Sequence, residues 1–131
     1  MTSRAKIVLD ASVVLAVIRR ERGGDALPRQ VLARATISTV NLAEVQSKLV
    51  KDGHDPETAW KDAISVVTSV EPYTPEQAKI AGSLIAETQS LGLSLGDRSC
   101  LALARVLDAE VYTADQIWRN LNIGIPIHIL R

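Results

Sequence analysis

The chain has 131 residues, enough for one domain with a sizeable core, and its 47% hydrophobic and 23% charged content is that of a globular protein, which excludes a disordered one. Its 15 basic and 15 acidic residues cancel, which excludes attraction to nucleic acid through overall charge. The single cysteine, Cys100, cannot form an internal disulfide, and no apolar run approaches the length of a membrane span. We therefore expect a soluble, cytoplasmic protein that does not associate with membranes, with one domain over residues 1–131.

The hydrophobic pattern predicts strands and helices in alternation. The predicted elements are, in chain order, a strand at 6–9, helices at 12–21 and 25–34, a strand at 35–38, helices at 41–52 and 55–67, a strand at 68–71, helices at 75–91 and 96–108, a strand at 109–113, a short helix near 115–121 and a last strand at 126–130. Strands that alternate with helices form a mostly parallel sheet covered on both faces. The expected fold class is therefore α/β: a three-layer α/β/α sandwich with a mostly parallel central sheet.

Four acidic residues lie near the starts of predicted helices. Asp10 follows the first strand, Glu44 lies in the helix after the second strand, and Asp115 follows the strand EVYT. Because the carboxyl ends of parallel strands meet at one edge of a sheet, where ligand sites form, we expect these three acids to lie close together. Asp97 begins a helix with no strand before it and shares a helical stripe with Cys100, which we expect to face inward.

Each acid also has a purely structural interpretation. Asp10 and Asp115 can cap helices, and the segments Asn41–Glu44 and Ser94–Asp97 resemble capping boxes. Glu44 can also pair with the lysine one helical turn later, and its position off the apolar stripe of its helix predicts an exposed side chain. Capping does not explain why several acids would lie close together, because neighbouring carboxylates repel each other unless a cation lies between them. Oxygen ligands without nearby His or Cys favour Mg²⁺ or Mn²⁺ over zinc.

Four segments together resemble the PIN domain, and within it the VapC-type toxins of prokaryotic toxin–antitoxin pairs: IVLDASVVLAVI, STVNLAEV, LGDRSCLALA and VYTADQIW. The resemblance implies an endoribonuclease dependent on Mg²⁺ or Mn²⁺, a homodimer, and a cognate antitoxin whose C-terminal arm covers the acidic crevice. By motif match, the family's catalytic and metal-binding acids fall on Asp10, Glu44, Asp97 and Asp115. Thr113 matches a hydroxyl position that lines this pocket, and Ser12 matches a small polar residue beside the first aspartate.

Basic residues near these motifs have two interpretations. Arg98, directly after Asp97, either helps to hold the acidic pocket or meets the substrate. Arg19, Arg20 and Arg22 either solvate the end of the first helix, where cations are favoured, or contact RNA phosphates. The two tryptophans are expected to be core or interface anchors, with base stacking as the other interpretation.

Two other functions compete with the nuclease. A phosphohydrolase or response-regulator-like domain also carries Asp at strand ends, but it requires a lysine after a later strand, and none follows the strands that precede Asp10 and Asp115. An inactive PIN-like module that only binds RNA or protein is the remaining alternative. The predicted function is a metal-dependent endoribonuclease that hydrolyses RNA phosphodiester bonds as the toxin of a type II toxin–antitoxin system.

Overall fold

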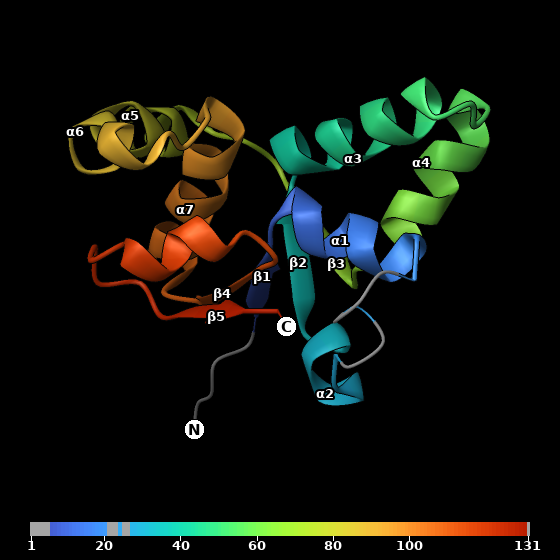
Figure 1. Cartoon of the computed structure of the whole chain (residues 1–131), viewed down its shortest axis with the longest axis horizontal. Helices are drawn as coiled ribbons and strands as arrows, with labels where there is room; N and C mark the ends of the chain where they lie inside the picture. The colour runs from blue at the N-terminus through green and yellow to red at the C-terminus, as the bar shows by residue number, and fades with distance from the viewer. Residues whose placement is uncertain (1–5, 21–23, 25–26, 131) are drawn as a thin grey trace.

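The computed structural model describes residues 6–20, 24 and 27–130 (Figure 1). Its five-stranded sheet has the order β3-β2-β1-β4-β5. The strands are β1 (Ile7–Leu9), β2 (Ala35–Ser38), β3 (Ser69–Glu71), β4 (Glu110–Thr113) and β5 (Ile127–Ile129). Each pair of neighbouring strands is parallel, and Ile7 of β1 lies opposite both Ala35 and Glu110. The parallel sheet predicted from the sequence is confirmed.

Helices cover both faces of this sheet, as predicted (Figure 1). On one side lie α1 (Ala11–Ile18), α3 (Thr39–Lys51) and α4 (Pro56–Ser65), and α2 (Arg29–Leu32) precedes β2. On the other side lie α5 (Pro75–Ser83), α6 (Ile85–Thr88), the short 3-10 turn η1 (Gln89–Leu91), α7 (Leu95–Leu107) and the 3-10 turn η2 (Gln116–Asn120). Within the described residues, no helix is both long enough and apolar enough to cross a membrane.

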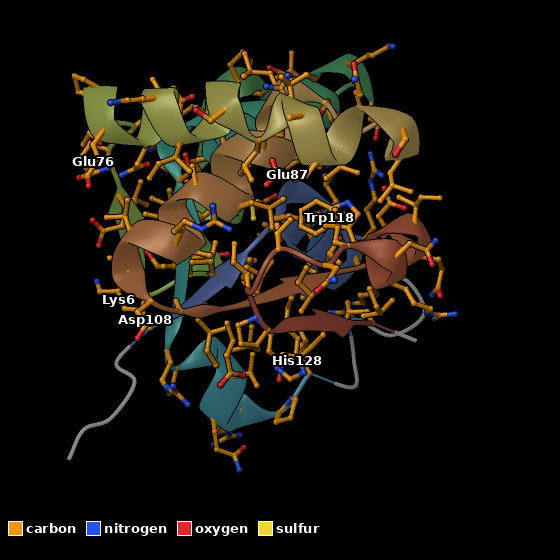
Figure 2. The ribbon with its side chains drawn as sticks, turned by 90° about the vertical axis from the view of Figure 1, so that its left-hand side faces the viewer. Lys6, Glu76, Glu87, Asp108, Trp118 and His128 are labelled. Carbon is orange, nitrogen blue, oxygen red and sulfur yellow. The ribbon has the colours of Figure 1, made fainter. Side chains whose placement is uncertain are left out.

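The alternation of side chains along β1 divides the interior into two cores. Ile7 and Leu9 face the helices α1, α3 and α4, whereas Val8 faces α7 and η2. Trp118 of η2 fills the second core and is only 1% exposed, which confirms it as a core anchor (Figure 2). Because apolar side chains from both faces of the central strands pack into these two cores, the sheet holds both helical layers in place.

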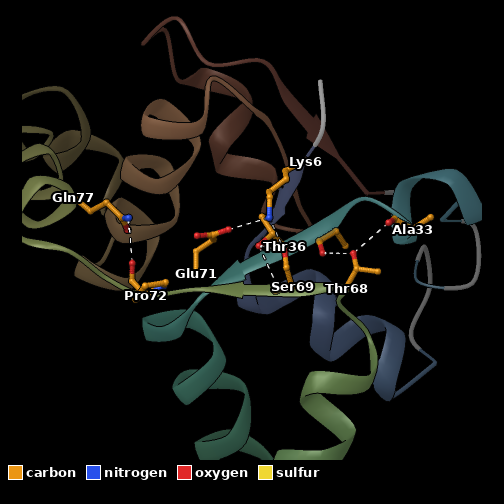
Figure 3. Close-up of polar contacts among 9 residues, drawn as sticks. Lys6, Ala33, Thr36, Thr68, Ser69, Glu71, Pro72 and Gln77 are labelled. Carbon is orange, nitrogen blue, oxygen red and sulfur yellow. Dashed lines mark hydrogen bonds and ion pairs between the residues drawn. The ribbon is translucent and has the colours of Figure 1, made fainter. Parts of the chain in front are cut away.

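The outer edge of the sheet is held by polar contacts instead (Figure 3). Lys6 Nζ donates to Ser69 Oγ at 3.2 Å and forms an ion pair with Glu71 Oε2 at 3.0 Å. The Ser69 hydroxyl donates in turn to Thr36 Oγ1 at 2.8 Å. These contacts tie β3 to β2 and to the residue that precedes β1. The order of the strands at this end of the sheet is therefore supported by side chains as well as by the backbone.

Two predicted helices differ from the observed ones. The helix expected at 25–34 is only α2 in the structure, and its first two positions lie outside the described residues. The helix expected at 75–91 is divided into α5, α6 and η1. At this division Ser83 Oγ donates to the Lys79 carbonyl and Thr88 Oγ1 donates to the Leu84 carbonyl. Bonds of this kind to the carbonyl four residues earlier often bend helices, and here they lie at the two points where the helix is divided.

Candidate active site

Asp10 lies where β1 ends and α1 begins, and it is 4% exposed. Its Oδ1 caps α1 by accepting from the Val13 backbone N–H at 3.2 Å, so the predicted cap is confirmed. Two hydroxyls also donate to it: Ser12 Oγ to Oδ1 at 2.6 Å, and Thr113 Oγ1 to Oδ2 at 2.7 Å. Thr113 ends the neighbouring strand β4, so strand pairing delivers this contact.

The direction of both hydroxyl bonds is set by the backbone after β4. The Ala114 N–H donates to Ser12 Oγ at 2.9 Å, and the Asp115 N–H donates to Thr113 Oγ1 at 3.0 Å. Since a backbone N–H can only donate and an ionised carboxylate can only accept, each hydroxyl accepts from the backbone and directs its own proton at Asp10. The side chain of Asp10 is thus surrounded by donors, an arrangement suited to an ionised carboxylate.

Burial works against that ionisation. It raises the pKa of Asp10 to about 6, and the negative charge of Asp97 adds to the rise, while the bonds from Ser12, Thr113 and Val13 lower the pKa. At neutral pH the carboxylate is therefore ionised at a free-energy cost. A cation beside it would remove that cost, because an opposite charge favours the ionised form.

Glu44 is not in solvent, contrary to the expectation from its helical stripe. It is partly buried, and its Oε1 accepts from Asn41 Nδ2 at 2.7 Å. The same amide nitrogen donates to the Gly96 carbonyl of α7 at 3.0 Å. The Asn41–Glu44 capping box is also wrong, because α3 begins two residues earlier, at Thr39, with Ser38 as its cap. Glu44 lies against the first turn of α7, at Gly96. It is therefore covered by a segment that is distant in the sequence.

Asp97 lies in the first turn of α7 and forms the predicted capping box with Ser94. The Asp97 N–H donates to Ser94 Oγ at 3.1 Å, and the Ser94 N–H donates to Asp97 Oδ2 at 2.9 Å. The capping box engages only one carboxylate oxygen. Asp97 is near enough to Asp10 for its charge to raise the pKa of that carboxyl group.

Buried Cys100, one turn further along α7, lies within reach of the charges of three of the acids. Burial raises the pKa of its thiol, and the negative charges of Asp10, Asp97 and Glu44 raise it further. Asp115 is exposed instead, and its Oδ1 caps η2 by accepting from the Ile117 N–H at 3.1 Å. Its backbone N–H, which donates to Thr113, is its connection to the cluster around Asp10.

Comparison with known proteins identifies the family of the chain. A family model described as the PIN domain matches residues 7–123. The chain belongs to the PIN-domain family. No curated protein sequence matches it.

Solved structures share the fold of this PIN domain. A chain of VapBC2 from Rickettsia felis, bound to a DNA fragment from its promoter, has a TM-score of 0.73 and 17% identity, covering 95% of this chain and 98% of that one. A chain of DNA-bound VapBC from Salmonella typhimurium has a TM-score of 0.72 and 20% identity, with coverage of 95% and 98%. VapC20 from Mycobacterium tuberculosis, described as a sarcin-ricin loop cleaving toxin, has a TM-score of 0.67 and 18% identity, with coverage of 92% and 100%.

Two of the arginines singled out from the sequence have described partners other than the acids of this PIN domain. Arg98 Nη1 donates to the Ala81 carbonyl of α5 at 2.9 Å. Arg19 forms an ion pair with Asp52 at 2.6 Å, which joins the end of α1 to the end of α3. Arg20 is exposed, and Arg22 lies outside the described residues.

The donor set of the PIN domain suits a hard divalent cation. Asp10, Glu44 and Asp97 offer only carboxylate oxygens, and no described Lys or Arg forms an ion pair with any of them. The side chains do not yet form a metal site, however. In the part of the chain that the structure describes, no three acidic, histidine or cysteine side chains lie close enough together to hold a metal ion. The chemistry of the residues fits Mg²⁺ or Mn²⁺, and the acids would have to move closer together to bind it.

Two residues of this site were not recognised from the sequence. Asn41 was interpreted as a cap, yet it is 1% exposed and bridges α3 to α7. Gly96 carried no expectation, and a Cβ at this position would lie 2.7 Å from both carboxylate oxygens of Glu44. The only signal in the sequence was their spacing from the acids, three residues before Glu44 and one before Asp97.

Proposed function

We propose that this PIN domain is a metal-dependent endoribonuclease and acts as the toxin of a type II toxin–antitoxin pair. The observation that carries the proposal is that the charges of Asp10, Glu44 and Asp97 all reach buried Cys100, while none of the three forms an ion pair with a Lys or Arg in the described part of the chain. Uncompensated carboxylates at the carboxyl edge of a parallel sheet are a costly arrangement that a bound cation explains. Family membership supports the nuclease, and the likeness of fold to chains of VapBC complexes supports the toxin.

In this proposal Asp10 and Asp97 hold Mg²⁺ or Mn²⁺, and Glu44 and Asp115 are direct or water-mediated ligands. The ion, when bound, activates a water molecule and neutralises the charge that develops on the RNA phosphate. Ser12 and Thr113 hold the carboxylate of Asp10 in one orientation through their short hydrogen bonds. One of the four carboxylates acts as a general base instead of a ligand, and accepts the proton of the attacking water.

The proposed partners are RNA, a second copy of the chain and a cognate antitoxin. The acidic cluster has no described basic partner of its own, so a basic side chain on the C-terminal arm of the antitoxin would be attracted to it. Such a side chain would replace the metal ion and prevent phosphate from approaching. Inhibition of the toxin is thereby explained by charge.

The test is cleavage of total RNA by the purified protein with Mn²⁺ or Mg²⁺, and with EDTA. Asp10→Asn and Asp97→Asn are the inactive variants. Asp108→Asn is the matched control, because it makes the same chemical change at the opposite end of α7 from Asp97, at an exposed position with φ of 52° that asparagine tolerates. We expect metal-dependent cuts from the wild type and Asp108→Asn only. Cleavage that persists in Asp10→Asn would show that the acidic cluster is not the active site.

An inactive module that binds RNA or protein is the second candidate. One observation favours it: no described group of three acidic, histidine or cysteine side chains is close enough to hold a metal ion. Titration of the wild type with Mn²⁺, followed by calorimetry, separates the two candidates. Binding without any cleavage of RNA would favour the inactive module, whereas binding with cleavage would exclude it.

A further inference from the structure

The carboxylate of Glu44 occupies the space that a side chain at position 96 would fill. A Cβ added to Gly96 would lie 2.7 Å from each carboxylate oxygen of Glu44 and 2.8 Å from its Cδ. Carbon atoms do not approach carboxylates so closely, so one of the two groups would have to move. Glu44 is the end of a flexible side chain, and it is therefore the carboxylate, not the backbone of α7, that would be displaced.

The backbone does not explain why glycine is at position 96. Gly53, Gly92 and Gly124 have positive φ angles, but Gly96 is an ordinary residue of the first turn of α7. Glycine is a poorer helix former than alanine, so this position carries a cost in helix stability. Space for Glu44 is the property that only glycine provides here.

Asn41 holds the carboxylate in this space. Its Nδ2 donates at 2.7 Å to Glu44 Oε1 and at 3.0 Å to the Gly96 carbonyl, so both hydrogens of the amide are used between α3 and α7. Asn41 is 1% exposed, so water does not compete for these hydrogen bonds. Since both partners are acceptors, the amide nitrogen must point toward them, which fixes the orientation of the side chain.

We propose that Gly96 and Asn41 are positioning residues for Glu44. Gly96 leaves the space, Asn41 fixes the carboxylate in it, and Asp97 follows Gly96 directly, so this contact determines where the carboxylate of Glu44 lies relative to the first turn of α7. The inference rests on the proposed function, because it is metal binding and RNA cleavage that the placement of Glu44 serves.

The test uses the full chain with Gly96→Ala in two backgrounds, the wild type and Glu44→Ala. In EDTA, Gly96→Ala is expected to leave the melting temperature unchanged or lower it when Glu44 is present. In the Glu44→Ala background the space is empty, and alanine is expected to raise the melting temperature through its better helix propensity. This difference between the two backgrounds depends on contact between the two positions and not on activity.

Gly82→Ala is the matched control. Gly82 lies in α5, is exposed, and an added Cβ there would meet no atom within 4 Å. Its replacement should shift the melting temperature equally in both backgrounds. An equal shift for Gly96→Ala would overturn the proposal, because it would mean that Glu44 does not occupy the space.

The second readout is the affinity for Mn²⁺, measured by calorimetry. Residues that orient metal ligands typically change affinity by about tenfold or more when they are replaced, and we expect a loss of this size for Gly96→Ala and for Asn41→Ala. Gly82→Ala should bind Mn²⁺ like the wild type. Wild-type affinity in Gly96→Ala would overturn the positioning role. A wild type that neither binds Mn²⁺ nor cleaves RNA would overturn the proposed function instead, and the melting temperatures in EDTA would still decide the placement of Glu44.

Discussion

Asp10→Asn is expected to make the metal-free protein more stable at neutral pH. An acid whose pKa is raised on folding holds its proton more tightly in the folded state, so its ionisation favours unfolding. The rise in the pKa of Asp10 from 3.8 to about 6 corresponds to a loss of about 3 kcal/mol of stability at pH values above 6. The contribution of Asp10 to the free energy of unfolding is fully present below about pH 4 and is lost as the pH rises through 6.

Asparagine does not ionise and so avoids this loss of stability, but it cannot keep all the hydrogen bonds that Asp10 accepts. It can still cap α1 through its side-chain oxygen, as Asp10 does for Val13. Its amide nitrogen cannot accept a bond from a hydroxyl, and Ser12 and Thr113 each donate to a different oxygen of Asp10. One of these bonds is therefore lost or reversed, at a cost of about 1 kcal/mol. The net gain at pH 8 is then about 2 kcal/mol.

Urea denaturation in EDTA, followed by tryptophan fluorescence, measures this difference. Trp118 is buried and reports the loss of the core. The difference in unfolding free energy between Asp10→Asn and the wild type should grow by about 2 kcal/mol between about pH 4.5 and pH 8. Asp108→Asn should follow the wild type across this range. A difference that is independent of pH, or an Asp10→Asn variant that is less stable at pH 8, would refute the argument from desolvation.

Three further predictions concern the metal and the core. Saturating Mn²⁺ should raise the melting temperature of the wild type but not of Asp10→Asn, with a stabilisation of about 2.7 kcal/mol at one hundred times Kd; equal shifts would place the ion elsewhere. Leu101→Ala should lower the unfolding free energy by about 2–5 kcal/mol in urea, because Leu101 is 0% exposed. Burial raises the pKa of the Cys100 thiol and shields it, so a thiol reagent should label it only as fast as the protein unfolds. Rapid labelling of the native protein would contradict this placement.

Local patterns were sufficient to predict much of the fold. The predicted strand 35–38 matches β2, and the capping box of Ser94 and Asp97 forms as expected, because both depend on residues close together in the chain. Parallel pairing then brings Thr113 beside Asp10, as the order of strands and helices implied. These features follow from local propensity and from the rule that parallel strands end at one edge.

Contacts between distant segments could not be predicted in this way. The stripe of α3 placed Glu44 in solvent, since a helical pattern contains no information about Gly96 on α7. The helix expected at 75–91 is interrupted at Ser83 and Thr88, whose hydroxyls bind the carbonyls of the preceding turn. Asp115 was expected beside the other acids because it follows β4. Its side chain instead accepts a hydrogen bond from the Ile117 N–H of the 3-10 turn that comes next.

The hydrogen bond from Thr113 to Asp10 joins residues that are 103 positions apart. A contact of this span closes a long loop and requires β4 to have paired with β1, which belongs to the late part of folding in parallel sheets. A chain that is still emerging from the ribosome has Asp10 long before it has Thr113. The hydrogen-bonded setting of Asp10 is therefore absent from any chain whose synthesis has not yet passed β4.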